Sequence, residues 1–280
     1  MPGLRPDIDP DGLLEYSVVF TDRSLNHMSA AFQGVMHDIH AGLTGVYGAE
    51  RAVVVPGGGS YAMEAVARQF ATDKRVLVIR NGFFSYRWSQ IFEAGRIPAH
   101  ETVLKARRTG TGPTAPFAPA PIDEVVAAIH AERPDVVFAP HVETASGIIL
   151  PDAYVRAVAA AAHDVGALFV LDCVASGCAW VDMAASGVDV LISAPQKGWS
   201  ASPCAGLVML SAAALERCRA AQSSSFAIDL GRWLAIMEAY LNGGHAYHAT
   251  MPTDALRGFR DAMLETQAAG YETLRAAQWE

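Results

Sequence analysis

The chain has 280 residues, of which 51% are hydrophobic and 18% charged, so it can bury one large core or two smaller ones. Its formal net charge of −8 argues against nucleic acid or an anionic membrane surface as the main partner, because neither would be attracted electrostatically. A small-molecule ligand fits this charge better.

The N-terminal segment, MPGLRPDIDPDGLLEY, is acidic and interrupted by prolines. It has neither the positive flank nor the apolar run of a signal peptide. No stretch of the chain reaches about 18 uncharged apolar residues, the length that a membrane span requires. We therefore expect a cytoplasmic protein without a membrane partner.

Short β-branched runs alternate with longer helical patterns along most of the chain. The runs expected to form strands are Ala52–Pro56, Val76–Arg80, Val136–Pro140, Leu168–Asp172 and Val190–Ser193. The segments expected to form helices are Tyr61–Phe70, Ser85–Ala94, Ile122–Ala131 and Asp152–Val165, with Asp152 as an N-cap. This alternation predicts an α/β fold in three layers, a mostly parallel sheet with helices on both faces.

Two further segments depart from this alternation. Residues 107–121 hold four prolines and two glycines without hydrophobic periodicity, which predicts a long loop between two βα units. After the apolar run Gly206–Leu210 the pattern becomes mainly helical, and the chain stops at Ala268–Glu280 in what reads as the middle of a helix. That ending favours a fragment or a truncated form, although a natural short form is the alternative.

The four cysteines lie within or beside apolar segments and lack the C-x-x-C spacing of a zinc or redox site. We interpret them as reduced core residues of a cytosolic protein. They are Cys173, Cys178, Cys204 and Cys218.

Two neighbouring strands deliver reactive side chains to one edge of the predicted sheet. Leu168–Asp172 ends in a carboxylate at its C-terminal end, where open α/β sheets bind their ligands, and the following strand delivers Gln196 and Lys197. A lysine can form an imine with an aldehyde, and an aspartate can keep a pyridine nitrogen protonated. These are the central requirements of catalysis with pyridoxal 5'-phosphate, although the same pair also fits an ordinary surface lysine.

A glycine-rich turn follows the first predicted strand. Residues 53–65 run from that strand through Gly57, Gly58, Gly59 and Ser60 into a helix. Free N–H groups and the helix dipole at such a turn form an anion site suited to phosphate, although a glycine turn without a ligand is the alternative. The turn is neither a P-loop nor a G-x-G-x-x-G fingerprint, which disfavours a nucleotide-binding Rossmann protein.

Five motifs in the same order resemble the class V aminotransferases, the family of alanine–glyoxylate and serine–pyruvate aminotransferases, from about Ala30 to Leu256. They are GGGSYAMEA at Gly57–Ala65, NGFFSYRW at Asn81–Trp88, HVETASG at His141–Gly147, DCVAS at Asp172–Ser176 and APQKGWSASPCAG at Ala194–Gly206. The resemblance implies a large domain of the fold type I pyridoxal-phosphate transferases. Residues 1–30 would be an N-terminal arm, 31–256 the cofactor-binding domain, and 257–280 the start of a helix leading to an absent small domain.

The resemblance also implies roles for individual residues. Lys197 would be the Schiff-base lysine, Asp172 the partner of the pyridine nitrogen, and Gln196 and Thr144 hydrogen-bond donors near the ring hydroxyl. Val174 would pack on one face of the ring. The remaining roles are ring stacking by Phe84, for which an ordinary core phenylalanine is the alternative, and phosphate binding by Gly58, Gly59 and Ser60.

We also interpret one polar pair and three histidines in or near these motifs. Tyr247 and Thr250 resemble a pair that the family contributes to the neighbouring subunit's phosphate, which implies a homodimer with shared sites. We interpret His141 as a structural residue, because the stacking group comes from the Phe84 segment. His245 and His248 have metal-compatible spacing but no third ligand in sequence, so we expect no metal site.

The resemblance predicts an aminotransferase that moves an amino group from an amino acid to a small 2-oxo acid such as glyoxylate or pyruvate, with ping-pong kinetics. In this class, the arginine that binds the substrate carboxylate normally lies in the small domain. Arg87 is a candidate substitute, although a positional role is the favoured interpretation. The alternatives are an aminoethylphosphonate transaminase, a lyase, a cysteine desulfurase, or a non-catalytic domain that retains the fold.

Overall fold

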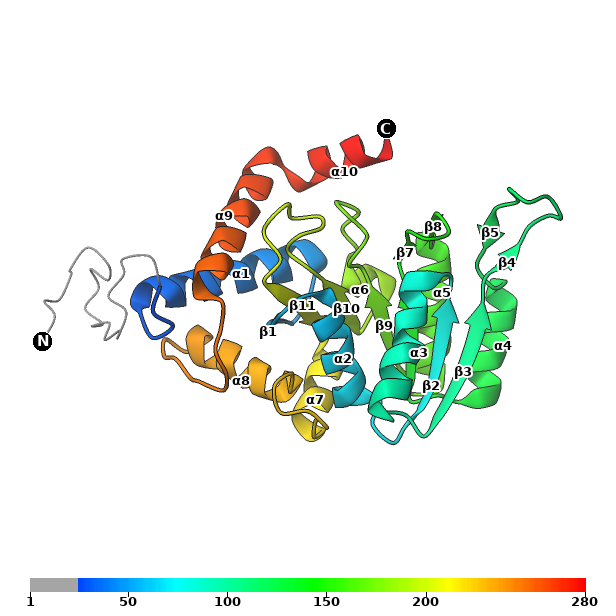
Figure 1. Ribbon diagram of the computed structural model, residues 1–280, viewed down its shortest axis with the longest axis horizontal. Helices are drawn as coiled ribbons and strands as arrows, with labels where there is room; N and C mark the ends of the chain where they lie inside the picture. Colours follow the sequence, from blue (N-terminus) through cyan, green and yellow to red (C-terminus); the bar gives the residue numbers. More distant parts are fainter. Residues whose placement is uncertain (1–24) are drawn as a thin grey trace, which may run out of the picture.

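The computed structural model describes residues 25–280 and shows a central seven-stranded sheet between two layers of helices (Figure 1). The strand order is β1-β11-β10-β9-β6-β2-β3, and β11 runs antiparallel to both of its neighbours while the other pairs are parallel. The strands are β1 Arg51–Pro56, β2 Arg75–Arg80, β3 His100–Lys105, β6 Val136–Pro140, β9 Leu168–Asp172, β10 Val190–Ser193 and β11 Ala205–Leu210.

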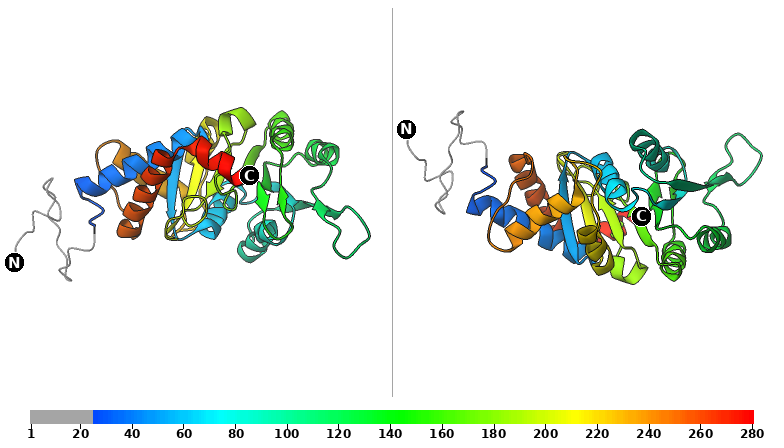
Figure 2. Two further views of the ribbon diagram at one scale, coloured as in Figure 1. Left: turned by 90° about the horizontal axis from the view of Figure 1, so that it is seen from above. Right: turned by 90° about the horizontal axis from the view of Figure 1, so that it is seen from below.

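Helices cover both faces of this sheet, as the alternation predicted. Seen from above in Figure 2, α4 and α5 lie on one side of the sheet and α3 on the other. The helices are α1 Ala30–Tyr47, α2 Gly59–Phe70, α3 Phe83–Gly95, α4 Ile122–Glu132, α5 Asp152–Asp164, α6 Met183–Ser186, α7 Ala212–Ala220, α8 Leu230–Leu241, α9 Thr253–Ala269 and α10 Tyr271–Trp279. The three-layer α/β fold is confirmed.

The central strands are buried over their whole length, because helices cover both of their faces. All residues of β6, β9, β10 and β11 are buried, and these strands consist mainly of Val, Leu, Ile, Phe and Ala. Three of the strands have the predicted bounds to the residue. The parallel strands end at a common edge, so the segments that follow β6, β9 and β10 lie close together.

The structure corrects several expectations. Pro151, not Asp152, is the N-cap of α5; Asp152 is the first helical residue and makes no capping hydrogen bond, although its charge suits the positive end of the helix dipole. The predicted loop at residues 107–121 contains a short ribbon of β4 Arg107–Arg108 and β5 Phe117–Ala118. The single helix expected over Ala268–Glu280 is divided at Gly270, whose φ of +91° ends α9 before α10 begins.

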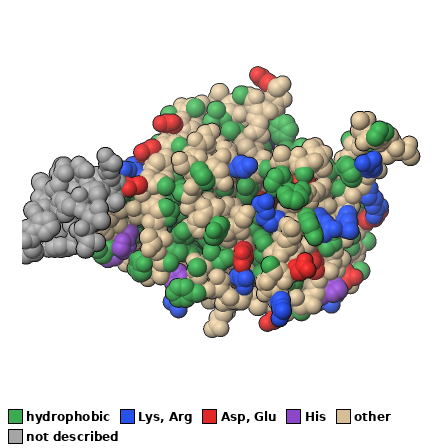
Figure 3. Space-filling view, viewed as in Figure 1, with side chains coloured by type: hydrophobic (Ala, Val, Ile, Leu, Met, Phe, Trp, Pro, Cys, Tyr) green, Lys and Arg blue, Asp and Glu red, His purple; other side chains and the backbone are tan. Residues whose placement is uncertain are grey.

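The cysteines are free thiols, and three of the four are buried, as predicted for core residues; Cys178 is partly exposed. No helix within residues 25–280 is long and apolar enough to cross a membrane. On the face shown in Figure 3, acidic and basic side chains lie among one another and among hydrophobic ones.

Candidate active site

The turn predicted to bind phosphate lies between β1 and α2. Gly57 has φ +124°, which other residues rarely adopt, and Gly58 is the N-cap of α2 without a side-chain hydrogen bond. The N–H groups of the first helical turn have no partners within the helix, and the helix dipole attracts anions to them. Gly206 on β11 faces this turn, since a Cβ there would lie 2.7 Å from the Gly58 carbonyl oxygen. The turn is therefore packed closely onto the sheet.

Asp172 is the last residue of β9 and is only 8% exposed. Its Oδ1 accepts a hydrogen bond from the Val174 N–H at 2.9 Å. Burial raises the pKa of Asp172 to about 6, and this effect exceeds the opposing influence of the Val174 hydrogen bond and of the nearby Arg87 charge. A buried carboxylate of this kind gains from a cationic partner in the pocket, and a protonated pyridine nitrogen is such a partner.

Lys197 lies in the turn that follows β10. The turn is tight: the Lys197 carbonyl accepts from the Ser200 N–H at 3.1 Å, and Ser200 has φ +53°. Gly198 lies directly on the neighbouring loop, where a Cβ would come within 2.2 Å of the Gly177 carbonyl oxygen. The sequence has only three lysines, and Lys197 alone among them lines the pocket described next.

One pocket brings together most of the residues that the sequence predicted. Its lining includes Gly59, Ser60, Phe84, Thr144, Asp172, Val174, Gln196 and Lys197. Gly58 adjoins the pocket as the residue before Gly59. The carboxylate, the amine and the glycine-rich turn thus converge from β9, the segment after β10 and the start of α2.

The pocket fits the flat ring and phosphate of pyridoxal 5'-phosphate. The Gln196 Oε1 is buried and has no hydrogen-bond partner among the described residues, so a ligand donor in the pocket would satisfy it. Gly59 leaves room beside Val174, because a Cβ at Gly59 would lie 2.9 Å from Val174 Cγ2. A carboxylate, a lysine and a helix N-terminus are also the groups that this cofactor needs in its site.

Phe84 lines the pocket from the first turn of α3. Phe84 is 38% exposed, so the alternative of an ordinary core phenylalanine is wrong. Arg87, one turn further along α3, also lines the pocket. Its Nη1 donates to Ser60 Oγ at 3.0 Å, and its guanidinium carbon lies 5.5 Å from the centroid of the Phe84 ring. The sequence alone did not show that Arg87 faces the pocket.

His141 and Glu143 lie beside the pocket and do not line it. His141 is buried, its Nδ1 lies 2.7 Å from Ser176 Oγ, and burial lowers its pKa to about 4. Glu143 is fully buried and accepts hydrogen bonds from the Phe84 and Ser85 N–H groups at the start of α3. The sequence interpretation of His141 as a structural residue agrees with this arrangement.

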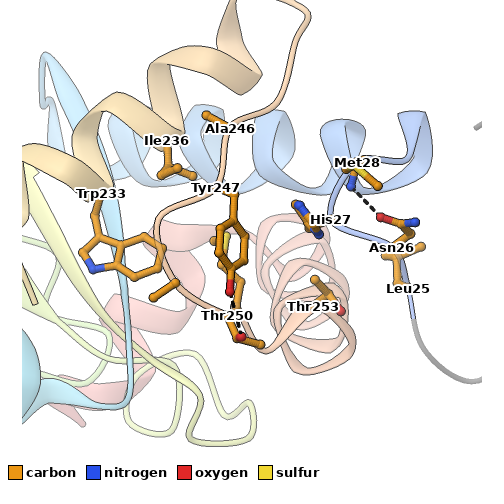
Figure 4. A pocket seen from close by; sticks show the side chains of 12 residues that line it. Leu25, Asn26, His27, Met28, Trp233, Ile236, Ala246, Tyr247, Thr250 and Thr253 are labelled. Carbon is orange, nitrogen blue, oxygen red and sulfur yellow. Dashed lines mark hydrogen bonds between the residues drawn. The ribbon is translucent and has the colours of Figure 1, made fainter. Parts of the chain in front are cut away.

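Tyr247 and Thr250 lie in a different pocket, shown in Figure 4. The Tyr247 hydroxyl is 3.3 Å from Thr250 Oγ1, and the Tyr247 ring centroid is 5.6 Å from that of His27. Tyr247 is 65% exposed. Neither residue lines the pocket of Lys197 within the same chain, so a role at a cofactor site would have to be at another subunit's site.

The histidines near Tyr247 have other contacts. The Nε2 of His248 is 2.7 Å from the Phe226 carbonyl oxygen, and His245 packs edge-on against His27. Among residues 25–280, no three His, Cys, Asp or Glu side chains are grouped so that they could hold a metal ion.

Comparison with known proteins extends this picture. The 2-aminoethylphosphonate–pyruvate transaminase of Vibrio vulnificus is 31% identical over 222 residues, which cover 78% of this chain and 56% of that protein. The enzyme of the same name from Burkholderia mallei is 30% identical over an alignment that covers 100% of this chain and 73% of that protein. A solved alanine–glyoxylate aminotransferase from Nostoc sp. matches with a TM-score of 0.74 and 26% identity, covering 89% of this chain and 63% of that one.

The mostly parallel sheet with helices on both faces is that of a fold type I pyridoxal-phosphate transferase. The chain spans 56% of the length of the Vibrio vulnificus relative, so the comparison concerns a part of that enzyme's length. Residues 13–278 match the family Aminotransferase class-V, and the chain belongs to this family. The cofactor of the family is pyridoxal 5'-phosphate.

Proposed function

We propose that this chain forms the cofactor-binding part of an aminotransferase that moves an amino group from an amino acid to a small 2-oxo acid such as pyruvate or glyoxylate. The observation that carries the proposal is the convergence of Lys197, Asp172 and the α2 turn in one pocket. The names of the relatives support the same class of reaction.

Each wall of the pocket would hold one part of pyridoxal 5'-phosphate. Lys197 would attach the cofactor through its Nζ, and Asp172 would keep the proton on the ring nitrogen. The ring would lie between Phe84 and Val174, with Gln196 and Thr144 near the ring hydroxyl. The phosphate would accept hydrogen bonds from the α2 turn at Gly58, Gly59 and Ser60.

When bound, the cofactor supplies a protonated pyridine ring that withdraws electrons from the substrate Cα. Asp172 would favour the protonated form of that nitrogen, because a cation beside its buried carboxylate would offset part of the cost of burying the charge. The Nζ of Lys197 would be the base in the pocket that accepts the proton of the substrate Cα and later gives it up. Phe84 and Val174 would limit the access of water to the two faces of the ring.

Arg87 is the residue that we propose for anion recognition in this pocket. It is the second cation of the lining besides Lys197, and its bond to Ser60 places the guanidinium next to the phosphate-binding turn. A guanidinium there suits either the cofactor phosphate or an acidic group of the substrate, because both accept two parallel hydrogen bonds.

A second candidate donor is 2-aminoethylphosphonate, which the names of the curated relatives favour. A cysteine desulfurase is less well supported, because that chemistry needs a reactive thiolate. None of the four cysteines lines the pocket, and burial raises the pKa of Cys204 to about 11 and that of Cys218 to about 12.

The wider organisation also remains a proposal. We propose a homodimer in which Tyr247 and Thr250 reach the neighbouring subunit's phosphate, because their pocket is separate from that of Lys197 and Tyr247 is exposed. Residues 31–256 would form the cofactor-binding domain and 257–280 the start of the helical link to a small domain; most of the proposed arm, 1–30, lies outside the described residues. Four free cysteines favour a cytoplasmic location.

The test is a pair of half-reactions followed by absorbance. The protein loaded with pyridoxal 5'-phosphate is mixed with alanine, serine or 2-aminoethylphosphonate, and conversion to the pyridoxamine form is measured. Pyruvate or glyoxylate should then restore the original spectrum. Conversion by 2-aminoethylphosphonate alone would select the second candidate, and loading without any half-reaction would support a non-catalytic domain.

A further inference from the structure

Glu143 is a fully buried carboxylate in β7 Val142–Glu143, the first strand of the segment that follows β6. Its Oε2 accepts from the Ser85 N–H at 2.8 Å and from the Ser85 hydroxyl at 2.6 Å. Its Oε1 accepts from the Phe84 N–H at 3.1 Å and from the Ala145 N–H at 3.3 Å. The charge of Glu143 is therefore met mainly by the first turn of α3.

The start of α3 needs such a partner from another part of the chain. Its N-cap is Gly82, which has no side chain to accept from the first N–H groups. A Cβ at Gly82 would lie 2.7 Å from Glu143 Cγ, so the glycine makes room for the carboxylate. Glu143, 58 residues away from Ser85 in sequence, takes the place of a local cap and gains from the helix dipole.

Ser85 ties the preceding turn to the same carboxylate. Its hydroxyl oxygen accepts from the Asn81 N–H at 2.8 Å and the Gly82 N–H at 3.0 Å, while its proton points to Glu143. The whole turn from Asn81 to Ser85 is thereby fixed relative to β7. Because Phe84 is 38% exposed, this backbone anchoring contributes to the position of its ring, together with the contact of the ring with Arg87.

We infer that Glu143 is a positioning residue that holds Phe84 in place against the cofactor ring, an inference that rests on the proposed function. In sequence, Glu143 also lies between Val142 and Thr144, which line the pocket. The carboxylate therefore connects the start of α3 with the segment after β6.

The test measures affinity for pyridoxine 5'-phosphate, which has the ring and the phosphate of the cofactor but no aldehyde to react with Lys197. The variants are Glu143→Gln, Phe84→Ala and the double variant. In Glu143→Gln, the amide group replaces one acceptor oxygen with a donor that faces other donors, so the turn loses its anchor. Each single variant should weaken binding roughly three- to tenfold, the range of a lost aromatic contact.

The double variant distinguishes positioning from a general loss of stability. If Glu143 acts through Phe84, then Glu143→Gln should change affinity little in a chain that already lacks the ring. The control is Asp189→Asn, because Asp189 is another buried carboxylate outside the pocket; it is bonded to the Phe169 N–H, to the Ser211 hydroxyl and to His163. Asp189→Asn should lower the melting temperature and leave the affinity of the folded protein unchanged.

Where Glu143→Gln does not fold, Ser85→Ala replaces it, since it removes one bond to Glu143 and keeps the carboxylate. Unchanged affinity in a folded Glu143→Gln or Ser85→Ala protein, or additive losses in the double variant, would overturn the inference while leaving the proposed function intact. Wild-type protein that binds neither pyridoxine 5'-phosphate nor pyridoxal 5'-phosphate would overturn both.

Discussion

Asp172 destabilises the cofactor-free protein at neutral pH, because its pKa is raised to about 6 from an ordinary value of 3.8. A carboxyl whose folded pKa is raised stabilises the fold below its unfolded pKa, and this contribution is lost as the pH rises through the folded pKa. Asp172→Asn should therefore increase the free energy of unfolding at pH 7 by up to about 3 kcal/mol, while affinity for pyridoxal 5'-phosphate falls.

The pH dependence of the free energy of unfolding distinguishes the effect of Asp172 from that of buried histidines, whose pKa values shift in the opposite direction. Burial lowers the pKa of both His141 and His40 to about 4, so their contribution to stability is lost as the pH falls from about 6.5 toward 4. Those groups are present in both proteins, so urea unfolding should show a difference between Asp172→Asn and wild type that grows between about pH 4 and 6. A difference that is constant from pH 4 to 7 would contradict the assignment.

At the scale of elements, the contact between β11 and the start of α2 constrains the glycine-rich turn that we propose binds phosphate. Gly206→Ala would place a Cβ 2.4 Å from Ala62 Cβ and 2.7 Å from the Gly58 carbonyl oxygen. Overpacking of this kind typically costs about 1–3 kcal/mol, and we expect it to displace the turn and weaken binding of inorganic phosphate and cofactor.

The control for this prediction is Gly34→Ala in the middle of α1, where a Cβ would meet nothing within 4 Å. Alanine there should stabilise the protein by roughly 0.5–1 kcal/mol, because glycine loses more backbone entropy in a helix. Chemical denaturation and cofactor titration measure both variants. Full cofactor affinity in Gly206→Ala would show that the close packing of β11 is not needed for the turn.

The elements also show which parts of the fold a sequence reveals. Strands β6, β9 and β10 were predicted to the residue, because they are continuous apolar runs buried on both faces. The edge strand β3 was not predicted, since HETVLK mixes polar and apolar residues and is only partly buried. Helix α1 was missed although its buried residues Val35, Ile39 and Leu43 have helical spacing, a signal that periodicity could have detected.

The site also contains some residues that the sequence predicts and others that it does not. Lys197, Asp172 and the glycine turn follow strands, so their meeting at one sheet edge follows from the topology. The roles of Arg87 and Glu143 depend on contacts with Ser60 and Ser85, which are 27 and 58 residues away. Contacts between residues so far apart in sequence produce no local pattern from which they could be predicted.

At the scale of the whole molecule, the proposed dimer predicts that two variants, each lacking part of the cofactor site, can complement each other in a mixed dimer. We would mix Lys197→Ala protein with the double variant Tyr247→Phe/Thr250→Ala and let the subunits exchange. A mixed dimer contains one site with both an intact lysine and an intact phosphate pair. If the pair acts across the interface, equal mixing should restore about a quarter of the wild-type number of tight cofactor sites, from the statistics of a two-fold dimer.

Size-exclusion chromatography of the separate proteins is the control, because each variant must still form the wild-type assembly. No gain on mixing, with dimers present throughout, would show that Tyr247 and Thr250 do not complete a partner's site. A monomer in every preparation would contradict the shared-site proposal directly.

The central claim is that Lys197 binds the cofactor, and the small number of lysines makes it directly testable. The chain contains Lys74, Lys105 and Lys197, and the first two are exposed and lie outside the pocket. The protein is incubated with pyridoxal 5'-phosphate, reduced with borohydride, digested and analysed by mass spectrometry. We predict one reduced cofactor on Lys197 and none on the other two lysines at limiting cofactor. Equal labelling of all three lysines, or labelling undiminished in Lys197→Ala, would contradict the account.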